Sequence, residues 1–538
     1  MLRPFRSLAF APLLLIPFCA GAATYTVGPS GRQYTQLTDL FRSRDLAPGD
    51  LVLVDGSATY SGNIVVGDDD GGSSASPVTI RWSRAAGTTR PVLSGGTNTI
   101  KFEQSNNIVL EGFDVRGGSN ACIFSEADNV TVRDSVIHDC PGQGILGADN
   151  NSGSFTLEYN EIYNAGSGTN RHVIYMQSDE VAFPNAVFRM RYNYVHNGNG
   201  GNLLKSRHQR NEIYYNWLEG AAYQELELIG PDCNTQQGGW STALKREDSD
   251  VVGNVIVHTS SWRNAIRAGG DLDGLSQGRV RLVDNTVLFD RAGAATMVLV
   301  QLGLESVEMQ NNVLYQNASG SAPAVLAENP ASDVDTPACS PFLREPWSSG
   351  RKVAGGNNWF QTSATSVPGE LVATLRGSNP QLTDIARRDL RPLAASPLVD
   401  AGNRSPAAPA AFPFPNPLTI PVYEPPSHAK LAIGAQKART VQGASIDIGA
   451  FEQTGASAAP VPMNDAHPLI PPKVRALVPA SGAKPKAGAS RTVPGASLDA
   501  ATPVADVARR DEDHAFRLLP PWWWMVAVYA YLQRNGWL

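Results

Sequence analysis

A short asparagine-centred pattern recurs through the middle of the chain and constrains the fold more than any other feature. Alternating apolar residues lead to Asn, then any residue, then an aliphatic or aromatic side chain, as in Tyr159-Asn160-Glu161-Ile162. The asparagines at this position are Asn160, Asn193, Asn216, Asn254, Asn285, Asn311 and Asn357, and Phe113 and Ser135 hold the same place earlier. The shortest intervals are 22 to 25 residues. The sequence is therefore built from repeats, some of them with insertions.

A unit of this length holds three strands of four to five residues with their turns. Such a unit cannot bury its inner face alone, but stacked units can, each pairing with the next at about 4.8 Å. The recurrent Asn fits a bend between two strands, where its amide can bond to the Asn of the next unit. Leucine-rich repeats need a periodic Leu, which is absent, and propeller blades need about 40 to 50 residues. We predict an all-β, right-handed parallel β-helix, the hand following the rule for parallel crossovers.

Composition agrees with many short strands and excludes some partners. Gly (50) and Pro (38) are abundant, and only 17% of the residues are charged. The net charge of −6 argues against nucleic acid, whose binders present a basic face. No apolar stretch in the middle of the chain reaches the length of a membrane span. We expect a monomer.

The amino terminus has the pattern of a secretory signal. Arg3 and Arg6 precede the apolar run 8–19, and residues 20–22 are a small-residue cleavage site, so residues 1–22 are predicted to be removed on export. The expected location is secreted, periplasmic or at the cell surface. The cysteines that remain are Cys122, Cys140, Cys233 and Cys339. They allow three disulfide pairings or free buried thiols, and both alternatives stay open.

The carboxyl-terminal part differs in composition from the repeats. The β-helix is predicted over 23–452, followed by an Ala/Pro-rich linker at 453–517 and a Trp-rich apolar segment at 518–538. The apolar run is too short to span a bilayer. Trp and Tyr favour the membrane boundary, so peripheral membrane contact is one interpretation; a tail that packs on the solenoid or stays unfolded is the other.

The two ends of the predicted β-helix carry a family resemblance. Thr24-Tyr25-Thr26-Val27, with Pro48-Gly49-Asp50 and Leu51–Val54, resembles the start of secreted proteins of the pectate-lyase-like superfamily. Ser396–Gly402 and Asp447–Glu452 resemble their last coils. The resemblance covers about residues 24–452 and implies the fold. Because the superfamily includes lyases, hydrolases, epimerases and non-catalytic adhesins, it leaves the activity open.

One strand of each unit can be aligned by its inward aliphatic residue. The inward residues are Ile123, Ile145, Ile174, Leu204, Leu226, Ile266 and Val300. The following residues then point outward: Phe124, Leu146, Tyr175, Lys205, Glu227, Arg267 and Gln301. With Arg207 and Glu225 two residues away, the alignment predicts one charged patch of Tyr175, Lys205, Arg207, Glu225, Glu227 and Arg267.

This patch suits cleavage of a uronic-acid polysaccharide by β-elimination. That reaction needs a group that neutralises the substrate carboxylate, a base and an acid. Arg207 or Arg267 could grip the carboxylate, Lys205 could be the base, and Tyr175 or an Arg the acid. Lysine is scarce before residue 400, which favours a special role for Lys205. His172 lies beside the patch, either as a structural or as a catalytic histidine.

The patch resembles that of chondroitinase B and related alginate lyases, in which a Lys and an Arg act beside a carboxylate-bound calcium. The resemblance implies Lys205 as base and Glu225 and Glu227 as Ca²⁺ ligands. The order of the coils departs from the family pattern, which leaves the calcium and the choice between Arg207 and Arg267 open.

The predicted function is thus that of a polysaccharide lyase, which is a carbon–oxygen lyase, with an anionic polysaccharide as its partner. Two other functions are alternatives to it. Glu225 and Glu227 could be an inverting hydrolase pair, although the polygalacturonase motifs are absent. The β-helix could also be a non-catalytic carbohydrate-binding or stalk protein at the surface. Solvated charges on a sheet face are common, which keeps this third function in view.

Overall fold

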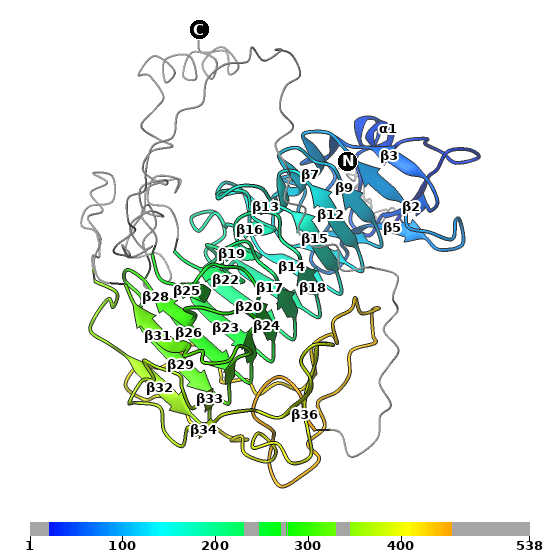
Figure 1. Ribbon diagram of the computed structural model, residues 1–538. Coiled ribbons are helices and arrows are strands. Elements are labelled where there is room, and N and C mark those ends of the chain that lie inside the picture. The colour runs from blue at the N-terminus through cyan, green and yellow to red at the C-terminus, as the bar shows by residue number, and fades with distance from the viewer. Residues whose placement is uncertain (1–20, 231–246, 271–275, 277, 330–344, 454–538) are drawn as a thin grey trace, which may run out of the picture. The chain divides into compact units, whose positions relative to one another are not determined.

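The computed structural model describes residues 21–230, 247–270, 276, 278–329 and 345–453. Nearly all of the predicted leader, linker and Trp-rich segment, and Cys233 and Cys339, lie outside these ranges. Within them the chain forms a right-handed parallel β-helix, as predicted (Figure 1). Each coil contributes one strand to each of three parallel sheets, A, B and C, in that order.

The described strands are as follows. Sheet A contains β1 (Thr24–Val27), β2 (Leu51–Asp55), β5 (Val78–Ser83), β8 (Ile108–Glu111), β11 (Val130–Arg133), β14 (Phe155–Glu158), β17 (Val187–Arg191), β20 (Arg210–Tyr214), β23 (Asp248–Val252), β26 (Arg279–Val283), β29 (Ser306–Gln310) and β32 (Val353–Gly356). Sheet B contains β3 (Thr59–Ser61), β6 (Val92–Ser94), β9 (Asp114–Arg116), β12 (Val136–Cys140), β15 (Glu161–Ala165), β18 (Tyr194–His196), β21 (Trp217–Glu219), β24 (Val255–His258), β27 (Thr286–Phe289), β30 (Val313–Gln316), β33 (Trp359–Gln361) and β34 (Leu375–Gly377). Sheet C contains β4 (Ile64–Val66), β7 (Asn98–Glu103), β10 (Ala121–Glu126), β13 (Gln143–Gly147), β16 (Ile174–Met176), β19 (Leu204–Ser206), β22 (Leu226–Leu228), β25 (Asn264–Ala268), β28 (Thr296–Val300) and β31 (Ala324–Glu328).

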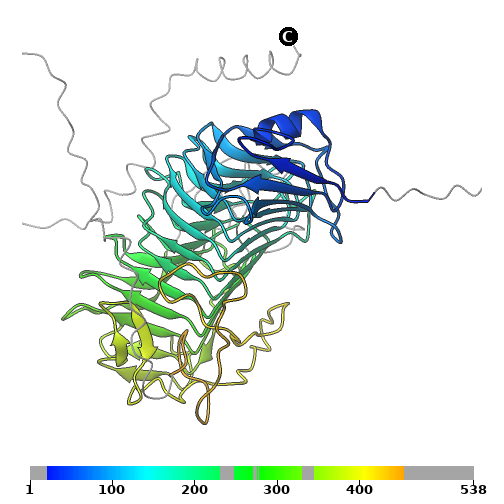
Figure 2. The ribbon, with the colours of Figure 1, turned by 90° about the vertical axis from the view of Figure 1, so that its right-hand side faces the viewer.

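Elements outside the three sheets lie near the two ends of the coil series. The helix α1 (Leu37–Ser43) follows β1 and buries Leu37 and Leu40 in the core. An antiparallel pair, β35 (Leu382–Asp384) and β36 (Asp389–Pro392), follows the last coil. Figure 2 shows the colours running in chain order along the stack, because each coil packs on its neighbours in sequence.

The asparagines of the repeat form a ladder in the turn from sheet A to sheet B. Side-chain Nδ2 of each donates to Oδ1 of the next, at 3.0 Å from Asn193 to Asn216 and from Asn216 to Asn254. The ladder members are Asn160, Asn193, Asn216, Asn254, Asn285, Asn312 and Asn358. All of them are fully buried, so the amides satisfy backbone groups that water cannot reach. Ser135 continues the ladder by bonding to Phe113 and Asn160, as its place in the repeat predicts.

The last two ladder positions differ by one residue from the prediction. Asn311 and Asn357 were expected, whereas Asn312 and Asn358 occupy the ladder. Asn311 and Asn357 precede them with φ of 55° and 53°. Asn is the non-glycine residue that best tolerates this left-handed conformation, so two adjacent asparagines serve two different needs.

The same left-handed position carries tyrosines in the central coils. Tyr159, Tyr192 and Tyr215 have φ between 56° and 60°, an uncommon conformation for bulky residues. Their rings stack at 5.0 and 5.4 Å between centroids, and Tyr423 packs edge-on against the last two. The stacking contributes packing that offsets the backbone strain.

The return segment, residues 393–453, folds back over the outside of the coils (Figure 1, yellow to orange). Pro417 O accepts a bond from Arg281, and Lys430 pairs with Asp134, many coils away. Arg439 is buried between Asp284 and Glu452. The segment therefore links coils that are not neighbours.

Candidate functional site on sheet C

The outer face of sheet C carries the predicted column of polar residues. Tyr175 pairs in register with Lys205, Lys205 with Glu227, and Glu227 with Arg267. The inward neighbours Ile174, Leu204, Leu226 and Ile266 are fully buried. Alternation along each strand thus positions the column, as predicted.

The predicted strand alignment in sheet C is correct up to Arg267 and wrong for the next strand, β28. Arg267 pairs with Leu299 and Ile266 with Val298, not with Gln301 and Val300. The strand β28 ends at Val300, so Gln301 lies just after the strand and outside its alternation. The polar column therefore runs from Tyr175 to Arg267, with Phe124 and Leu146 below it and Leu299 above it.

Glu227 is the centre of this column. It is 1% exposed and accepts a bond from Asn202 Nδ2. Arg267 forms an ion pair with one of its oxygens, and Lys205 Nζ lies 4.0 Å from the other. A buried carboxylate with two cations and an amide is well compensated, so Glu227 orders the two cations that flank it.

Tyr175 and Arg207 form a second pair beside Lys205. Arg207 is 3% exposed, donates from Nε to the Tyr175 oxygen at 3.0 Å, and donates from NH1 to Gly230 O at 2.6 Å. Lys205 Nζ lies 5.2 Å from the Tyr175 ring centroid, a cation–π contact. Arg207 therefore holds Tyr175, whereas the side chains of Lys205 and Arg267, which are 14% and 20% exposed, reach solvent.

His172 takes a structural position next to the column. It is buried, its Nδ1 accepts the Asn202 N–H at 2.9 Å, and its ring meets Tyr175 edge-on. The close approach uses Gly201, which has φ 53° and where an added Cβ would lie 2.3 Å from Nδ1. His172 therefore positions Asn202, which in turn bonds to Glu227.

Asn202 belongs to the site although sequence reasoning missed it. Its Oδ1 accepts the Gln224 N–H at 3.1 Å while its Nδ2 bonds to Glu227. Asn202 stands two residues before the inward-facing Leu204, so strand alternation predicts that its side chain also points into the core. It lies before β19 begins, where the backbone turns and alternation no longer applies.

Glu225 is not part of the outward patch, which corrects the expected charged surface. It is fully buried, its Oε2 lies 2.7 Å from His258 Nδ1, and it accepts the Ala221 N–H at 3.2 Å. Burial raises the pKa of Glu225, and although burial lowers the pKa of His258, the Glu225 carboxylate raises it overall. Glu225 precedes β22, so its side chain turns toward the neighbouring coil rather than outward.

The predicted calcium ligands Glu225 and Glu227 therefore have separate partners. Within the described residues there is no group of three or more His, Cys, Asp or Glu side chains arranged to hold a metal ion. Calcium at this pair stays a prediction. Much of the insertion between Asn216 and Asn254 lies outside the described ranges.

Two basic residues that follow Lys205 in the sequence do not join the column. His208 is fully buried, and burial lowers its pKa to about 3. Arg210 begins β20 in sheet A, where it pairs with Asp250 at 2.5 Å. Among the described residues, Lys205 and Arg267 are the partly exposed cations that flank Glu227 on the outer face of sheet C.

Sheet B carries a second polar column that sequence reasoning missed. His138, Tyr163 and His196 stack with 5.0 Å between successive ring centroids. His138 lies between Asp114 and Asp139, and although burial lowers its pKa, these two carboxylates raise it overall. All three residues stand three places after a ladder position, so their spacing from the ladder residues could have predicted the column.

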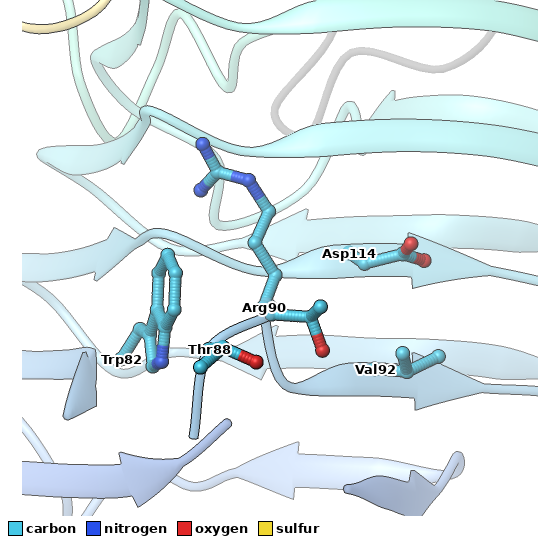
Figure 3. A pocket seen from close by; sticks show the side chains of 6 residues that line it. Trp82, Thr88, Arg90, Val92 and Asp114 are labelled. Carbon is cyan, nitrogen blue, oxygen red and sulfur yellow. The ribbon is translucent and has the colours of Figure 1, made fainter. Parts of the chain in front are cut away.

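A shallow pocket of 540 Å³ lies beside this column. Figure 3 shows Trp82 and Thr88 on one side and Val92 and Asp114 on the other, with Arg90 between them. Arg90 also bonds to Asp134, so its guanidinium is engaged in the fold. The pocket contains none of the predicted site residues.

Comparisons with known proteins find similarity only at low sequence identity. The family model described as "Periplasmic copper-binding protein (NosD)" matches residues 36–226, less than half of the chain. No curated protein matches. The pectate lyase Pel9A is similar at 13% identity, with a TM-score of 0.43 and coverage of 80% of this chain and 96% of that one.

Two further solved structures belong to different enzyme classes. An alginate lyase from Paenibacillus sp. str. FPU-7 has 17% identity, a TM-score of 0.35, and coverage of 57% of this chain and 98% of that one. A lacto-N-biosidase from Eubacterium ramulus has 11% identity, a TM-score of 0.30, and coverage of 62% of this chain and 68% of that one. All of these TM-scores lie below 0.5, so the comparisons assign no activity to this chain, whose described residues form a right-handed parallel β-helix.

Proposed function

We propose that the protein is an exported enzyme that cleaves an anionic, uronic-acid polysaccharide by β-elimination on the outer face of sheet C. The observation that supports the proposal is the order Tyr175, Lys205, Glu227, Arg267 on four consecutive strands. Two cations and a phenol face solvent in one column, and Glu227 orders both cations. Such a column matches the three tasks of the reaction.

The geometry suggests which residue performs each task. Arg267 is the more exposed arginine and is assigned to the substrate carboxylate, whose neutralisation makes the adjacent C–H acidic. Lys205 is assigned as the base that takes this proton. The Tyr175 oxygen accepts the Arg207 N–H, so its own hydroxyl proton is available to the leaving oxygen. Arg207 is then a positioning residue, because it is buried and bonded to Gly230 O.

A disulfide supports export. Cys122 and Cys140 are joined, which resolves one of the pairings left open by the sequence. Disulfides persist in oxidising compartments outside the cytosol. Within the described ranges, no helix is long and apolar enough to cross a membrane.

A non-catalytic glycan-binding protein is the second candidate. Lys205 and Arg267 both face the Glu227 carboxylate, an arrangement that also suits two fixed cations gripping an acidic sugar. The hydrolase alternative has less support, because Glu225 is buried with His258 and does not face a substrate together with Glu227.

Incubation with a panel of uronic-acid polysaccharides separates these functions. A lyase yields an unsaturated product that absorbs in the ultraviolet, and Tyr175→Phe should then lose most of the turnover. Phe124→Leu, on the same face below the column, is the matched control and should keep it. Reducing ends without that absorbance indicate hydrolysis, whereas binding with neither signal indicates the non-catalytic function. Either of these results contradicts the proposed lyase.

A further inference from the structure

Three oxygen-bearing side chains converge at the corner between sheets C and A. Glu180 lies in the connection from β16 to β17, Gln209 in that from β19 to β20, and Glu247 immediately before β23. Arg210 pairs in register with Asp248, so Gln209 and Glu247 hold the same place on consecutive coils. Consecutive coils are about 4.8 Å apart, which brings their side chains within reach of one ion.

Among the described residues, the polar atoms of Glu180 and Gln209 make no hydrogen bond of ordinary length. Glu180 is fully buried and Gln209 is 3% exposed, and the Gln209 amide faces the Glu180 carboxylate without approaching to within 3.5 Å. Buried polar groups nearly always have a partner, in the protein or as a bound water or ion. Four unpaired atoms in two neighbouring side chains therefore point to something bound between them.

Among the described residues, no cation offsets the charge around Glu180. Burial, followed by the Glu247 and Asp179 carboxylates, raises the pKa of Glu180 to about 9, while the Gln209 amide opposes the shift. Glu247 accepts a bond from Ser276 Oγ at 2.9 Å, so its carboxylate is held in place. A cation bound between these side chains would offset the negative charges that the fold brings together.

Asp179 is the other carboxylate nearby, but it has a separate role. Its Oδ1 accepts the N–H groups of Val181 and Ala182, and its Oδ2 accepts that of Asn151. These bonds shape the connection that brings Glu180 to the corner. The ion-binding oxygens are therefore those of Glu180, Gln209 and Glu247.

We propose that Glu180, Gln209 and Glu247 form an internal calcium site at the corner between sheets C and A. Carboxylate and amide oxygens are the ligands that Ca²⁺ prefers, and water completes its coordination. The site is distinct from the Glu225 and Glu227 pair that the sequence suggested. It holds the connection that contains Arg207, two residues from Gln209, and therefore steadies the strand that carries Lys205.

Calorimetric titration of the chelator-treated, full-length protein with Ca²⁺ at neutral pH tests the site. Wild type should bind calcium. Asp179 and Glu247 are the other titratable groups acting on Glu180. Calcium should also raise the melting temperature.

Variants decide which oxygens bind. Glu180→Gln should weaken calcium affinity at least about tenfold. Gln209→Met, which keeps the size and removes the amide oxygen, should also weaken affinity and provides a second test if Glu180→Gln does not fold. Glu212→Gln, on the outer face of β20 and paired with Arg189, is the matched control and should bind as wild type.

Three results would overturn the proposal. The chelator-treated wild type could bind no calcium, which would make Glu180 a buried protonated acid. Glu180→Gln could bind as tightly as wild type. Glu227→Gln could lose calcium while Glu180→Gln keeps it, which would place the ion on the outer face of sheet C. None of these measurements depends on an enzymatic activity, so the site and the proposed lyase function succeed or fail separately.

Discussion

At the residue scale, Lys205 tests the chemistry most directly. If it is the base, Lys205→Arg should lose most turnover while keeping glycan binding, because a guanidinium retains the charge but does not release its proton. Lys205→Ala should lose turnover and also weaken binding. Turnover by ultraviolet absorbance and affinity by titration are measured on both variants.

A purely electrostatic role for Lys205 gives the opposite order. Arg would then be tolerated, and Ala would be damaging. Near-normal turnover in Lys205→Arg would remove Lys205 from proton transfer and favour the glycan-binding function. Leu146→Ile, on the same column two coils away from Lys205, controls for changes in the sheet surface itself.

His138 provides a residue-scale prediction about pH. Its pKa in the folded protein lies above the ordinary 6.5, because Asp114 and Asp139 outweigh the effect of burial. The folded state therefore binds this proton more tightly than the unfolded chain. Its stabilising contribution is fully present below about pH 6.5 and is lost as pH rises through the folded pKa.

The comparison of wild type with His138→Gln measures this contribution. The variant should be less stable mainly in mildly acidic solution, and the two stability curves should approach each other at higher pH. Asp139→Asn, which removes one of the two carboxylates beside His138, should narrow the pH range over which protonated His138 stabilises the fold. Two parallel curves across the pH range would show that His138 acts through its stacking on Tyr163 alone.

At the element scale, the asparagine ladder sets how the coils stack. Asn216 Nδ2 donates to Met190 O, Tyr214 O and Asn254 Oδ1, and its own Oδ1 accepts from Asn193. Asn216→Ala leaves these buried groups unpaired and should cost about 1–3 kcal/mol of unfolding free energy. Denaturant unfolding measures the loss.

An asparagine outside the ladder is the matched control. Asn120 is exposed and bonds to Asn98 at 2.9 Å on the surface of the neighbouring turn. Asn120→Ala should change stability by less than about 0.5 kcal/mol. If Asn216→Ala is equally mild, the ladder does not stabilise the stack as its bonds suggest.

At the scale of the whole β-helix, Arg439 ties the return segment to the coils at Asp284. This side chain is 1% exposed and lies 3.3 Å from Asp284 and 2.7 Å from Glu452. Arg439→Met would leave two carboxylates buried without their cation and should cost about 3–5 kcal/mol. The loss should be smaller below the pKa of Asp284, which burial raises to about 7 despite Arg439, because a protonated Asp284 needs no partner.

Thermal unfolding together with limited proteolysis of residues 393–453 tests this role. Arg387→Met, at a side chain that is 72% exposed and paired with Asp384, is the control and should behave as wild type. Equal stability of the two variants would mean that the return segment covers the coils without supporting them.

Much of the candidate site follows from the sequence, because strand alternation is a local property. The spacing of the asparagines and the inward aliphatic residues place Tyr175, Lys205, Glu227 and Arg267 in one column, and the structure has that register. Inside a strand every second side chain points the same way, so the alternation of apolar and polar residues identifies the buried face. The same reasoning predicts the ladder from Phe113 to Asn285.

Tertiary structure decided the positions where strands end. Glu225 stands two residues before the outward-facing Glu227, but it precedes β22, and the turn there directs its side chain to His258 on the next coil. Asn202 stands two residues before the inward-facing Leu204, but it precedes β19, and the turn there directs its side chain to Glu227. A turn residue takes its direction from partners one coil away, and these two partners lie 33 and 25 residues distant along the chain. The period of the repeat therefore determines the fold and the column, whereas contacts between turns determine which polar groups complete the site.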